Sequence, residues 1–575
     1  MKKFQSNNHE KIRRLIMLSI WVIILIGLPL WWKTTEIYRA QLPFAEIEEW
    51  SKKREKLDIK FSTHFSLFIA TNVLEGNNNL DFKNLDVRLK ESITSKYNFI
   101  YSKHDVINTS KSIQFPVKFK IKEWNEWKDV LKEDFNLGQL NFTSKNGKYA
   151  FYILPGNNEN QKTKVLVGNQ RQAIVQIEQI EHWNIDFIEK TISNIIFNLF
   201  LPEQIATKKF ILEPSTEANV ELDSMRTMKY SPMYQVTFSL MNGDPSSLLV
   251  NWDIDQTVNK YLKPFVDKIS VISNLIVESQ IQHYARLTFE PQQKKITENI
   301  NYNINNNDND KYFYLTPDLL PHFINAAEWK LASAVSSYPT LNFILYVPSL
   351  EQSPLYIQDS KENIIKNNAF LIPRWGGVVI NNPDRSTGIH NFTSEELKSV
   401  MSIFIMQLRG LLGVQDFWVE AGSGLDSSIT IEFTSPQNTA ITMWELDSLV
   451  RRRIAENIVA TILTLKSLSQ LVAEIPNMVV LDHIQTEVLL ALDSLKKSCT
   501  SLQEEQYEIA LQHAKKAIER AESAFFDPTM VSMLYFPDEH KYAIYMPLFV
   551  PISVPLIVAL LREIKEFREN KKKKN

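Results

Sequence analysis

The chain has 575 residues, 44% of them hydrophobic, and its 64 basic side chains almost balance 66 acidic ones. The terminal tails, 1–14 and 562–575, hold 12 of the basic and 4 of the acidic residues, so the remainder has a formal charge of about −10. This charge disfavours nucleic acid as a partner, because phosphate binding requires concentrated Lys and Arg. The single cysteine, Cys499, excludes an internal disulfide, and the length favours more than one folding unit.

The first predicted element is a membrane anchor. Residues 15–32 carry no charge, and a helix of that length reaches roughly 27 Å, enough to cross the apolar core of a bilayer. The stretch ends in Trp31-Trp32 without a small-residue cleavage site, so we expect a retained helix rather than a cleaved signal peptide. The preceding tail, 1–14, is basic and therefore cytosolic by the positive-inside rule.

Residues 33–440 are predicted to form an α/β region. Runs with the alternation of strands occur at 65–70, 152–154, 236–240, 343–347 and 378–380, and helical patterns occur between them at 182–199, 258–273 and 323–336. Thr393 and Glu396 form a capping box at the start of another helix, which Gly413 is suited to end. The order of the strands does not follow from these patterns.

Residues 441–541 are predicted to form a helical bundle and a connector. Thr442 and Glu445 make a second capping box, followed by an apolar stripe and a stop at Pro476. Two more helices are expected at about 479–502 and 504–525, and the last carries alanines at helical spacing, namely Ala510, Ala514, Ala517 and Ala521. These amphipathic helices would pack closely against one another.

The second predicted anchor is 542–561, which also lacks charge and is followed by the basic tail 562–575. Both tails are then cytosolic, and residues 33–541 lie on the opposite side of the membrane from the cytosol. Pro547, Pro551 and Pro555 recur every four residues and so line one face of this helix. Since each proline removes a backbone donor, we expect this face to contact a partner's transmembrane helix, the alternative being a merely kinked anchor.

Short motifs agree with a lumenal location for the enclosed segment. Asn108, Asn141 and Asn391 begin Asn-x-Ser/Thr sequons and are candidate glycosylation sites. Lys572 and Lys573 near the C-terminus resemble the dilysine signal that retrieves proteins to the endoplasmic reticulum, although a charge cluster that orients the helix is the alternative. The predicted fold class is an α/β lumenal domain followed by a helical bundle, tethered by two transmembrane helices.

No catalytic residue is predicted. Cys499 continues the apolar stripe of Val488, Leu492 and Leu495, which favours a small core residue over a nucleophile. Ser423 lies between two glycines but in a loop context, without the strand-to-helix elbow of serine hydrolases. The P-loop and dinucleotide fingerprints do not occur, and we predict no cofactor.

Two charged motifs each allow a structural and a functional interpretation. Asp253-Ile-Asp255 and Asp308-Asn-Asp310 match the Asp-x-Asp pattern of metal-dependent glycosyltransferases, but Asp253 and Asp255 precede a helix whose N–H groups they are expected to cap. No metal site is predicted from the scattered histidines. The basic run 451–453 is expected to pair with nearby carboxylates on a solvated helix face.

Several longer stretches are distinctive: LPLWWKTTEIYRAQLPF at 28–44, EW at 328–329, YVP at 346–348, IPRWGGV at 372–378, QLRGLL at 407–412, WELD at 444–447, RRRIAE at 451–456 and the three prolines of the second anchor. Together they resemble the PIG-S family of glycosylphosphatidylinositol (GPI) transamidase subunits. The resemblance extends over nearly the whole chain and is weakest over 80–310.

The resemblance implies a complex of the endoplasmic reticulum membrane that replaces the C-terminal signal of a precursor protein with GPI. In that family the nucleophile belongs to a separate, PIG-K-like subunit, and PIG-T, PIG-U and a further GPI-attachment subunit complete the complex. The family member itself is regarded as non-catalytic, with GPI lipid or precursor protein as further contacts. Two alternatives stay open: a lumenal glycosyltransferase that uses Asp253 and Asp255, and a lumenal chaperone or translocation accessory.

Overall fold

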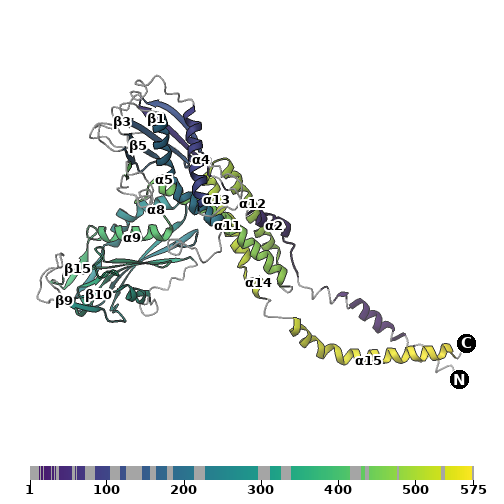
Figure 1. Ribbon diagram of the computed structural model, residues 1–575. Coiled ribbons are helices and arrows are strands. Elements are labelled where there is room, and N and C mark those ends of the chain that lie inside the picture. The colour runs from purple at the N-terminus through teal and green to yellow at the C-terminus, as the bar shows by residue number, and fades with distance from the viewer. Residues whose placement is uncertain are drawn as a thin grey trace. The chain divides into compact units, whose positions relative to one another are not determined.

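A computed structural model describes the following residues of the chain: 12, 15–16, 18–27, 29–30, 33, 38–54, 59, 61–70, 84–103, 117–124, 145–155, 163–177, 185–212, 227–295, 311–324, 338–386, 388–414, 429–433, 440–475, 478–532 and 538–572. Figure 1 labels their helices and strands. The chain divides into two compact units. The α/β unit comprises Leu57–Ile458 and Lys497–Lys515, and the helical unit comprises Met1–Lys56, Val459–Lys496 and Lys516–Asn575.

The first large sheet of the α/β unit has six strands in the order β16-β4-β5-β3-β1-β2. Its strands are β1 (Thr63–Ala70), β2 (Val117–Trp124), β3 (Lys148–Pro155), β4 (Thr163–Val167), β5 (Gln172–Ile177) and β16 (Ile429–Phe433). Only β4 and β5 pair antiparallel, and the other neighbours are parallel. Helices α4 (Leu85–Lys103) and α5 (Ile185–Leu212) contact each other and cover the core of this sheet.

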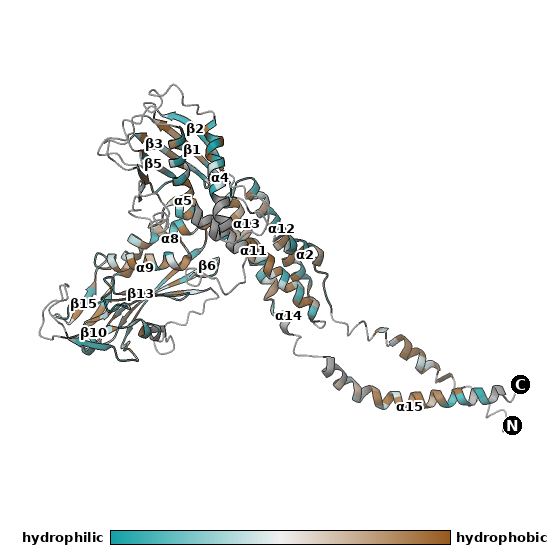
Figure 2. Cartoon of the chain, in the orientation of Figure 1, coloured by the Kyte–Doolittle hydropathy of each residue, from teal (hydrophilic) through white to brown (hydrophobic). Residues whose placement is uncertain are grey.

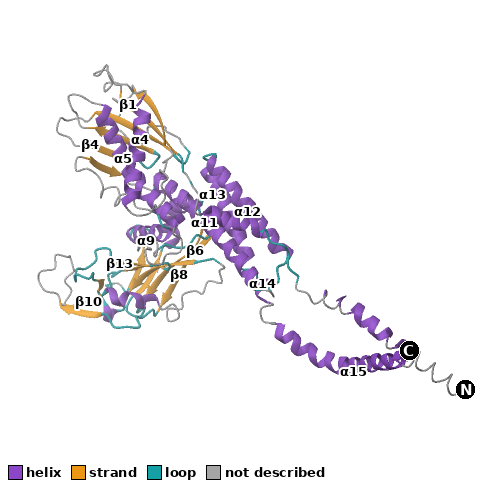
Figure 3. Ribbon diagram, turned by 45° about the vertical axis from the view of Figure 1, so that its right-hand side comes forward, coloured by secondary structure: helices purple, strands orange, loops and turns teal. Residues whose placement is uncertain are grey.

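The second large sheet has five strands in the order β13-β14-β11-β6-β8. They are β6 (Met233–Asn242), β8 (Asn274–His283), β11 (Thr340–Val347), β13 (Ala369–Ile372) and β14 (Gly376–Ile380). The accompanying helical segments are α7 (Ile254–Thr257), the π-helix η5 (Val258–Leu262), α8 (Lys263–Ile269) and α9 (Leu397–Leu412). Phe238, Phe343 and Phe404 join α9 to the sheet, with ring centroids 5.4–5.6 Å apart. Figure 3 shows the strands of both sheets in orange.

Two small sheets complete the α/β unit. β9 (Gln292–Lys295), β10 (Lys311–Leu315) and β12 (Leu355–Ile357) form one, and β7 (Leu249–Trp252) and β15 (Ile389–Phe392) form the other. The short 3-10 helices η6 (Pro317–Ile324) and η7 (Leu350–Gln352) flank the first of these. Leu315, Leu355 and Ile357 from the three-stranded sheet are buried with Ile344 and Tyr346 of β11, so both faces of the central strand are covered.

Long helices account for most of the C-terminal region. They are α11 (Met443–Glu474), α12 (Asp482–Gln503) and α13 (Tyr507–Phe525), followed by α14 (Pro528–Ser532) and α15 (Asp538–Lys572). In the helical unit, the apolar core joins the later part of α11, the first part of α12, the end of α13 and α2 (Phe44–Arg54). Its buried residues include Ile47, Leu468, Val488 and Ala521.

The local predictions are largely confirmed. The five predicted strand runs fall within β1, β3, β6, β11 and β14, and the mixed α/β sheets are followed by a helical region. Both capping boxes form: the N–H of Thr393 donates to Glu396 at 2.8 Å, and that of Thr442 donates to Glu445 at 2.8 Å. Gly413 ends α9 with φ 74°, a left-handed conformation that glycine adopts without strain.

Other boundaries differ from the predictions. The helix expected at 182–199 is α5, which ends only at Leu212, and the one expected at 258–273 begins as a π-helix and ends at Ile269. Of 323–336, only 323–324 lie within the described residues, at the end of η6. Among the residues that the structure describes, none of the helices combines the length with the apolar character that crossing a bilayer requires.

Candidate functional site

The first half of α11 carries an unusual set of buried charges. We call Glu445, Asp447, Arg451, Arg452, Arg453 and Glu456 the α11 polar cluster. Only 1–5% of the surface of Glu445, Asp447, Arg451 and Arg453 is exposed. A charge at such depth costs several kcal/mol unless it is paired and hydrogen-bonded, so the partners of these side chains decide what the cluster does.

Asp447 and Arg451 bind the first large sheet. Arg171, just before β5, donates to the Asp447 carboxylate through Nε and Nη2 at 2.6 and 2.7 Å. The Tyr149 hydroxyl on β3 donates to Asp447 at 3.1 Å and accepts from Arg451 Nη1 at 3.0 Å. Arg451 also donates to the Asn146 side-chain oxygen at 3.1 Å. These charge-assisted bonds hold the start of α11 against the N-terminal ends of β3 and β5.

Glu445 binds α9, the helix of the second large sheet. Its carboxylate accepts from Arg409 Nη2 at 2.8 Å while it also accepts the N–H of Thr442 in the capping box. Arg409 donates in addition to the carbonyl of Ala440. One carboxylate therefore caps α11 and neutralises a buried arginine on a second helix, which explains why the box lies in the interior of the unit.

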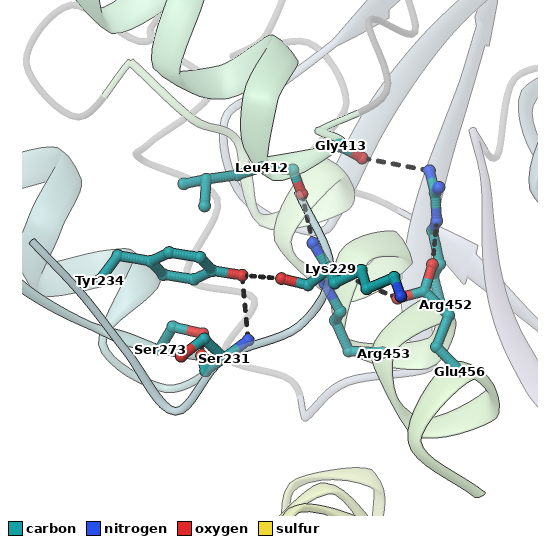
Figure 4. Close-up of polar contacts among 9 residues, drawn as sticks. All are labelled: Lys229, Ser231, Tyr234, Ser273, Leu412, Gly413, Arg452, Arg453 and Glu456. Atoms are coloured by element: carbon teal, nitrogen blue, oxygen red, sulfur yellow. Dashed lines mark hydrogen bonds and ion pairs between the residues drawn. The ribbon is translucent and has the colours of Figure 1, made fainter. Parts of the chain in front are cut away.

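Glu456 pairs with two arginines at once, as Figure 4 shows. Arg452 Nε and Arg453 Nη1 donate to its two oxygens at 2.8 and 2.7 Å. Arg453 also donates to the carbonyl of Leu412 at 2.8 Å, so it satisfies a carbonyl at the C-terminal end of α9. Burial acts to raise the pKa of Glu456, but the charges of Arg453 and Arg452 outweigh it and the pKa lies below the ordinary value.

Tyr234 and its neighbours continue the same region (Figure 4). The Tyr234 hydroxyl accepts from the N–H of Ser231 at 3.0 Å and donates to the carbonyl of Lys229. Ser273 Oγ donates to the carbonyl of Ser231 at 2.7 Å. Burial raises the pKa of Tyr234, so the hydroxyl keeps its proton and serves as a hydrogen-bonding group rather than as a base.

The prediction of a solvated face for residues 451–453 is wrong. Pairing with a nearby carboxylate does occur through Glu456, but Arg451 and Arg453 are buried. The reason is that α11 packs against elements of both large sheets within the α/β unit, so more than one of its faces is covered. The cluster binds side chains of both large sheets and their helices as well as the backbone, so it joins parts of the fold.

The candidate metal motif lies at a pocket of about 670 Å³. Its lining includes Trp252, Asp253, Gln256, Asn391 and Glu395, but not Asp255. Asp253 occupies the N-cap position of α7, yet its side chain makes no capping hydrogen bond, so the capping expected there does not form.

Glu395 of the same pocket pairs instead with Lys260 at 2.5 Å. Within the described residues, no group of three His, Cys, Asp or Glu side chains is placed to hold a metal ion. Asp308 and Asp310 lie outside the described residues.

Cys499 is half-buried on α12, whereas Val488, Leu492 and Leu495 of its predicted stripe are fully buried. Burial raises the pKa of the thiol to about 11. The thiolate required for nucleophilic attack is therefore scarce at neutral pH. Ser423 lies outside the described residues.

The remaining predicted sites differ in what the structure says of them. Asn391 is exposed on β15, while Asn108 and Asn141 lie outside the described residues. Pro547, Pro551 and Pro555 all lie inside α15. Lys572 is the last residue of that helix, and Lys573 lies outside the described part of the chain.

The sequence patterns did not indicate Arg171 and Arg409, the distant charged partners of the cluster. Arg409 had a readable signal, because it follows Leu408 at the edge of an apolar helix face, where a buried charge implies a buried counter-charge. Arg171 had none, since it stands between strands where a charged residue is ordinary.

Comparison with known proteins gives a consistent result. Residues 18–570 match the family described as "Phosphatidylinositol-glycan biosynthesis class S protein". The chain is 32% identical to "GPI-anchor transamidase component PIGS" of Bos taurus, covering 98% of this chain and 96% of that protein. It is 32% identical to the Homo sapiens protein of the same name, over 96% and 95%, and 29% identical to the "GPI transamidase component PIG-S homolog" of Schizosaccharomyces pombe, over 99% and 87%.

Proposed function

The chain belongs to the family of phosphatidylinositol-glycan biosynthesis class S proteins, and we propose that it works as a non-catalytic subunit of the GPI transamidase complex, supporting the attachment of GPI anchors to proteins in the endoplasmic reticulum. The observation that carries this proposal is the match itself, which spans residues 18–570 and includes relatives named as components of that transamidase. A match of this extent concerns the whole chain and not one shared module.

The chemistry of the described residues supports a non-catalytic role. Glu445, Asp447, Arg453 and Glu456 of the α11 polar cluster form ion pairs with one another, with Arg171 or with Arg409, and Arg451 donates to the Tyr149 hydroxyl and the Asn146 side-chain oxygen. The Cys499 thiol has a pKa of about 11, far from that of an activated nucleophile.

We further propose a two-pass topology in the endoplasmic reticulum membrane, with both termini in the cytosol. The uncharged stretches 15–32 and 542–561 and the basic tails 1–14 and 562–575 support it. Figure 2 colours much of α15 brown, for hydrophobic residues, and its C-terminal end teal. The α/β region and the helices up to 541 are then lumenal, and Asn391, exposed on β15, is available to a glycosyltransferase there.

As partners we propose the other subunits of the complex: a PIG-K-like catalytic subunit, PIG-T, PIG-U and a GPI-attachment subunit. The face of Pro547, Pro551 and Pro555 on α15 is the proposed contact for a partner's transmembrane helix. Prolines leave backbone carbonyls without their usual helical donors, and in a membrane another helix can supply such donors.

The proposed function is tested by depleting the protein in cells that express two reporters, one GPI-anchored and one secreted without an anchor. We expect unprocessed GPI precursor to accumulate while the secreted reporter is unaffected. Normal anchoring after depletion overturns the proposal, and a defect in both reporters indicates a general chaperone or translocation role.

Complementation separates scaffold from enzyme. Cys499→Ser and the double variant Asp253→Asn with Asp255→Asn should each restore anchoring to the depleted cells. Failure of the double variant to restore anchoring, with the complex still assembled, favours chemistry at the Asp253 pocket and contradicts the non-catalytic role.

A further inference from the structure

The two large sheets of the α/β unit have the same strand order. Numbered by their appearance in the chain, the strands of the first sheet run second, first, third, fifth, fourth: β2-β1-β3-β5-β4. The second sheet runs β8-β6-β11-β14-β13, which is the same sequence of positions. The first sheet adds β16 beyond its fourth strand.

Strand directions and helices agree as well. In both sheets the first strand pairs parallel with the second and the third, the third pairs parallel with the fifth, and the fourth and fifth are antiparallel. A helical segment joins the first strand to the second, α4 in one sheet and α7 to α8 in the other. Helices α5 and α9 follow the fifth strands, and α4 contacts α5 as α7 contacts α9.

This correspondence makes β2 and β8 equivalent edge strands, but the two strands carry different side chains. β2 alternates the exposed Lys118, Lys120 and Lys122 with the partly buried Phe119 and Ile121. Lysines on an edge strand discourage pairing with another chain. Lys118 also binds Glu505 of the α/β unit at 2.9 Å, which engages this edge further.

β8 has none of this protection. Its ten residues, NLIVESQIQH, include no Lys, Arg or Pro, and every one of them is at least partly exposed. Ile276 and Ile281 are 43% and 40% exposed. A strand of this length has an edge of roughly 33 Å, which is long enough to pair with a whole strand of another segment.

The backbone of β8 is directed to accept a strand. The N–H of Asn274 donates to the carbonyl of Pro232 beside β6, so alternate residues from Asn274 onward bond to β6. The intervening residues, Leu275, Val277, Ser279 and Ile281, therefore direct their N–H and C=O groups to the outer side. Within the described part of the chain these outward groups form no backbone hydrogen bond.

We propose that the α/β unit contains two copies of one β-α-β-β-β-β-α module and that the outer edge of β8, in the second copy, binds an extended segment of another subunit of the same complex by strand addition. This rests on the proposed function for the identity of the complex. The first copy shows that the module takes an added strand, since β16, from far along the chain, pairs with β4 at its other edge. The module is thus a template for β-augmentation.

Charge defines the segment that fits. Glu278 is the one carboxylate of β8, and one of its oxygens accepts from the Gln235 amide, so the strand carries an acidic side chain and no Lys or Arg of its own to oppose a cationic partner. The matching strand is neutral or basic and presents aliphatic side chains beside Ile276 and Ile281, because cross-strand apolar pairs stabilise such a ladder. A precursor polypeptide, or a segment of this same chain, is the competing occupant.

The first test places the photo-crosslinking residue benzoylphenylalanine at Ile276 or Ile281 in the full chain, within the assembled complex in its membrane. We expect a crosslink to one defined subunit, formed with or without precursor present, and no such crosslink from the exposed positions Lys120 and Lys122 on the equivalent edge strand β2. Crosslinks that require precursor, that stay within the chain, or that are absent overturn the proposal.

The second test gives β8 the lysines that protect β2. Ile276→Lys with Ile281→Lys should lower co-purification of the same subunit by about tenfold or more, with an unchanged protease-resistant pattern of the chain itself. The control, Ile509→Lys, alters an isoleucine of similar exposure, 44%, on α13 and should leave co-purification unchanged. Full co-purification of the double variant overturns the proposed binding at the β8 edge. The depletion experiment above tests the proposed function separately.

Discussion

At the residue scale, Glu456 is the counter-charge of two neighbouring arginines. Its carboxylate oxygens lie 2.7 Å from Arg453 and 2.8 Å from Arg452. Glu456→Gln leaves Arg453 buried without a full counter-charge, and we expect the free energy of unfolding to fall by about 3–5 kcal/mol. Urea denaturation of the detergent-solubilised chain, followed by tryptophan fluorescence, measures this loss.

Two checks make the Glu456 prediction specific. Glu395→Gln breaks the exposed pair with Lys260 and should change stability little. The pKa of Glu456 is lowered from 4.5 by its arginines in the folded chain, so its stabilisation is complete above pH 4.5 and is lost as the pH falls through the lower folded value. The natural chain should therefore lose more stability on acidification than Glu456→Gln, and equal losses would contradict this assignment.

Cys499 gives a second prediction at this scale. Burial raises the pKa of its thiol from 9.0 to about 11, which lowers the thiolate fraction near pH 8 about a hundredfold. Alkylation by iodoacetamide should be slower by that factor in the folded chain than in urea. Equal rates in the two conditions would show that the thiol is not buried in this way.

At the element scale, the start of α11 depends on its capping box. The Thr442 hydroxyl accepts the N–H of Glu445 at 3.3 Å, and the Glu445 carboxylate accepts the N–H of Thr442 at 2.8 Å. Thr442→Ala removes the first of these bonds and should lower the free energy of unfolding by about 1 kcal/mol, up to 2. Thermal unfolding of the full chain measures the effect.

Thr442→Ser is the matched control, because it keeps the hydroxyl and loses only a methyl group. It should restore most of the stability that Thr442→Ala loses. If both variants unfold alike, packing of the methyl group and not the cap stabilises this end of the helix.

The elements also show which features can be predicted from the sequence. Capping boxes, the αL glycine Gly413 and the buried Ala510, Ala514, Ala517 and Ala521 follow from residues at most a few positions apart, and all are observed. The π-helix of 258–262 interrupts a pattern that looks α-helical throughout. Its extra residue per turn leaves no mark in the apolar spacing, so the sequence did not indicate it.

At the scale of the whole molecule, the proposed topology makes a direct prediction. In sealed microsomes, proteinase K should remove epitope tags placed at residue 1 and at residue 575 while a fragment of about the size of 15–561 stays protected. Detergent should abolish the protection. Protection of either tag without detergent would contradict a two-pass chain with both termini in the cytosol.

The boundary between the two compact units does not follow from local sequence patterns. The boundary predicted at residue 440 rests on the change from mixed strand and helix patterns to helical patterns alone, and it stays a prediction. The compact units of the structure divide within α11, between Ile458 and Val459, because the first half of that helix packs against the sheets. Two side chains make those contacts. Trp444 stacks on Tyr149 with ring centroids 4.4 Å apart, and Asp447 binds Arg171.

The sequence by itself determined the strand and helix segments, the capped helix starts and the family, because these depend on side chains close together in the chain or on the order of residues alone. Only the tertiary structure decided the order of strands in the two sheets, the burial of Arg451 and Arg453 and their partners. Arg171 and Asp447 are 276 residues apart. Whether a charged residue is solvated or buried depends on what packs against it, and for α11 that is set by segments hundreds of positions away.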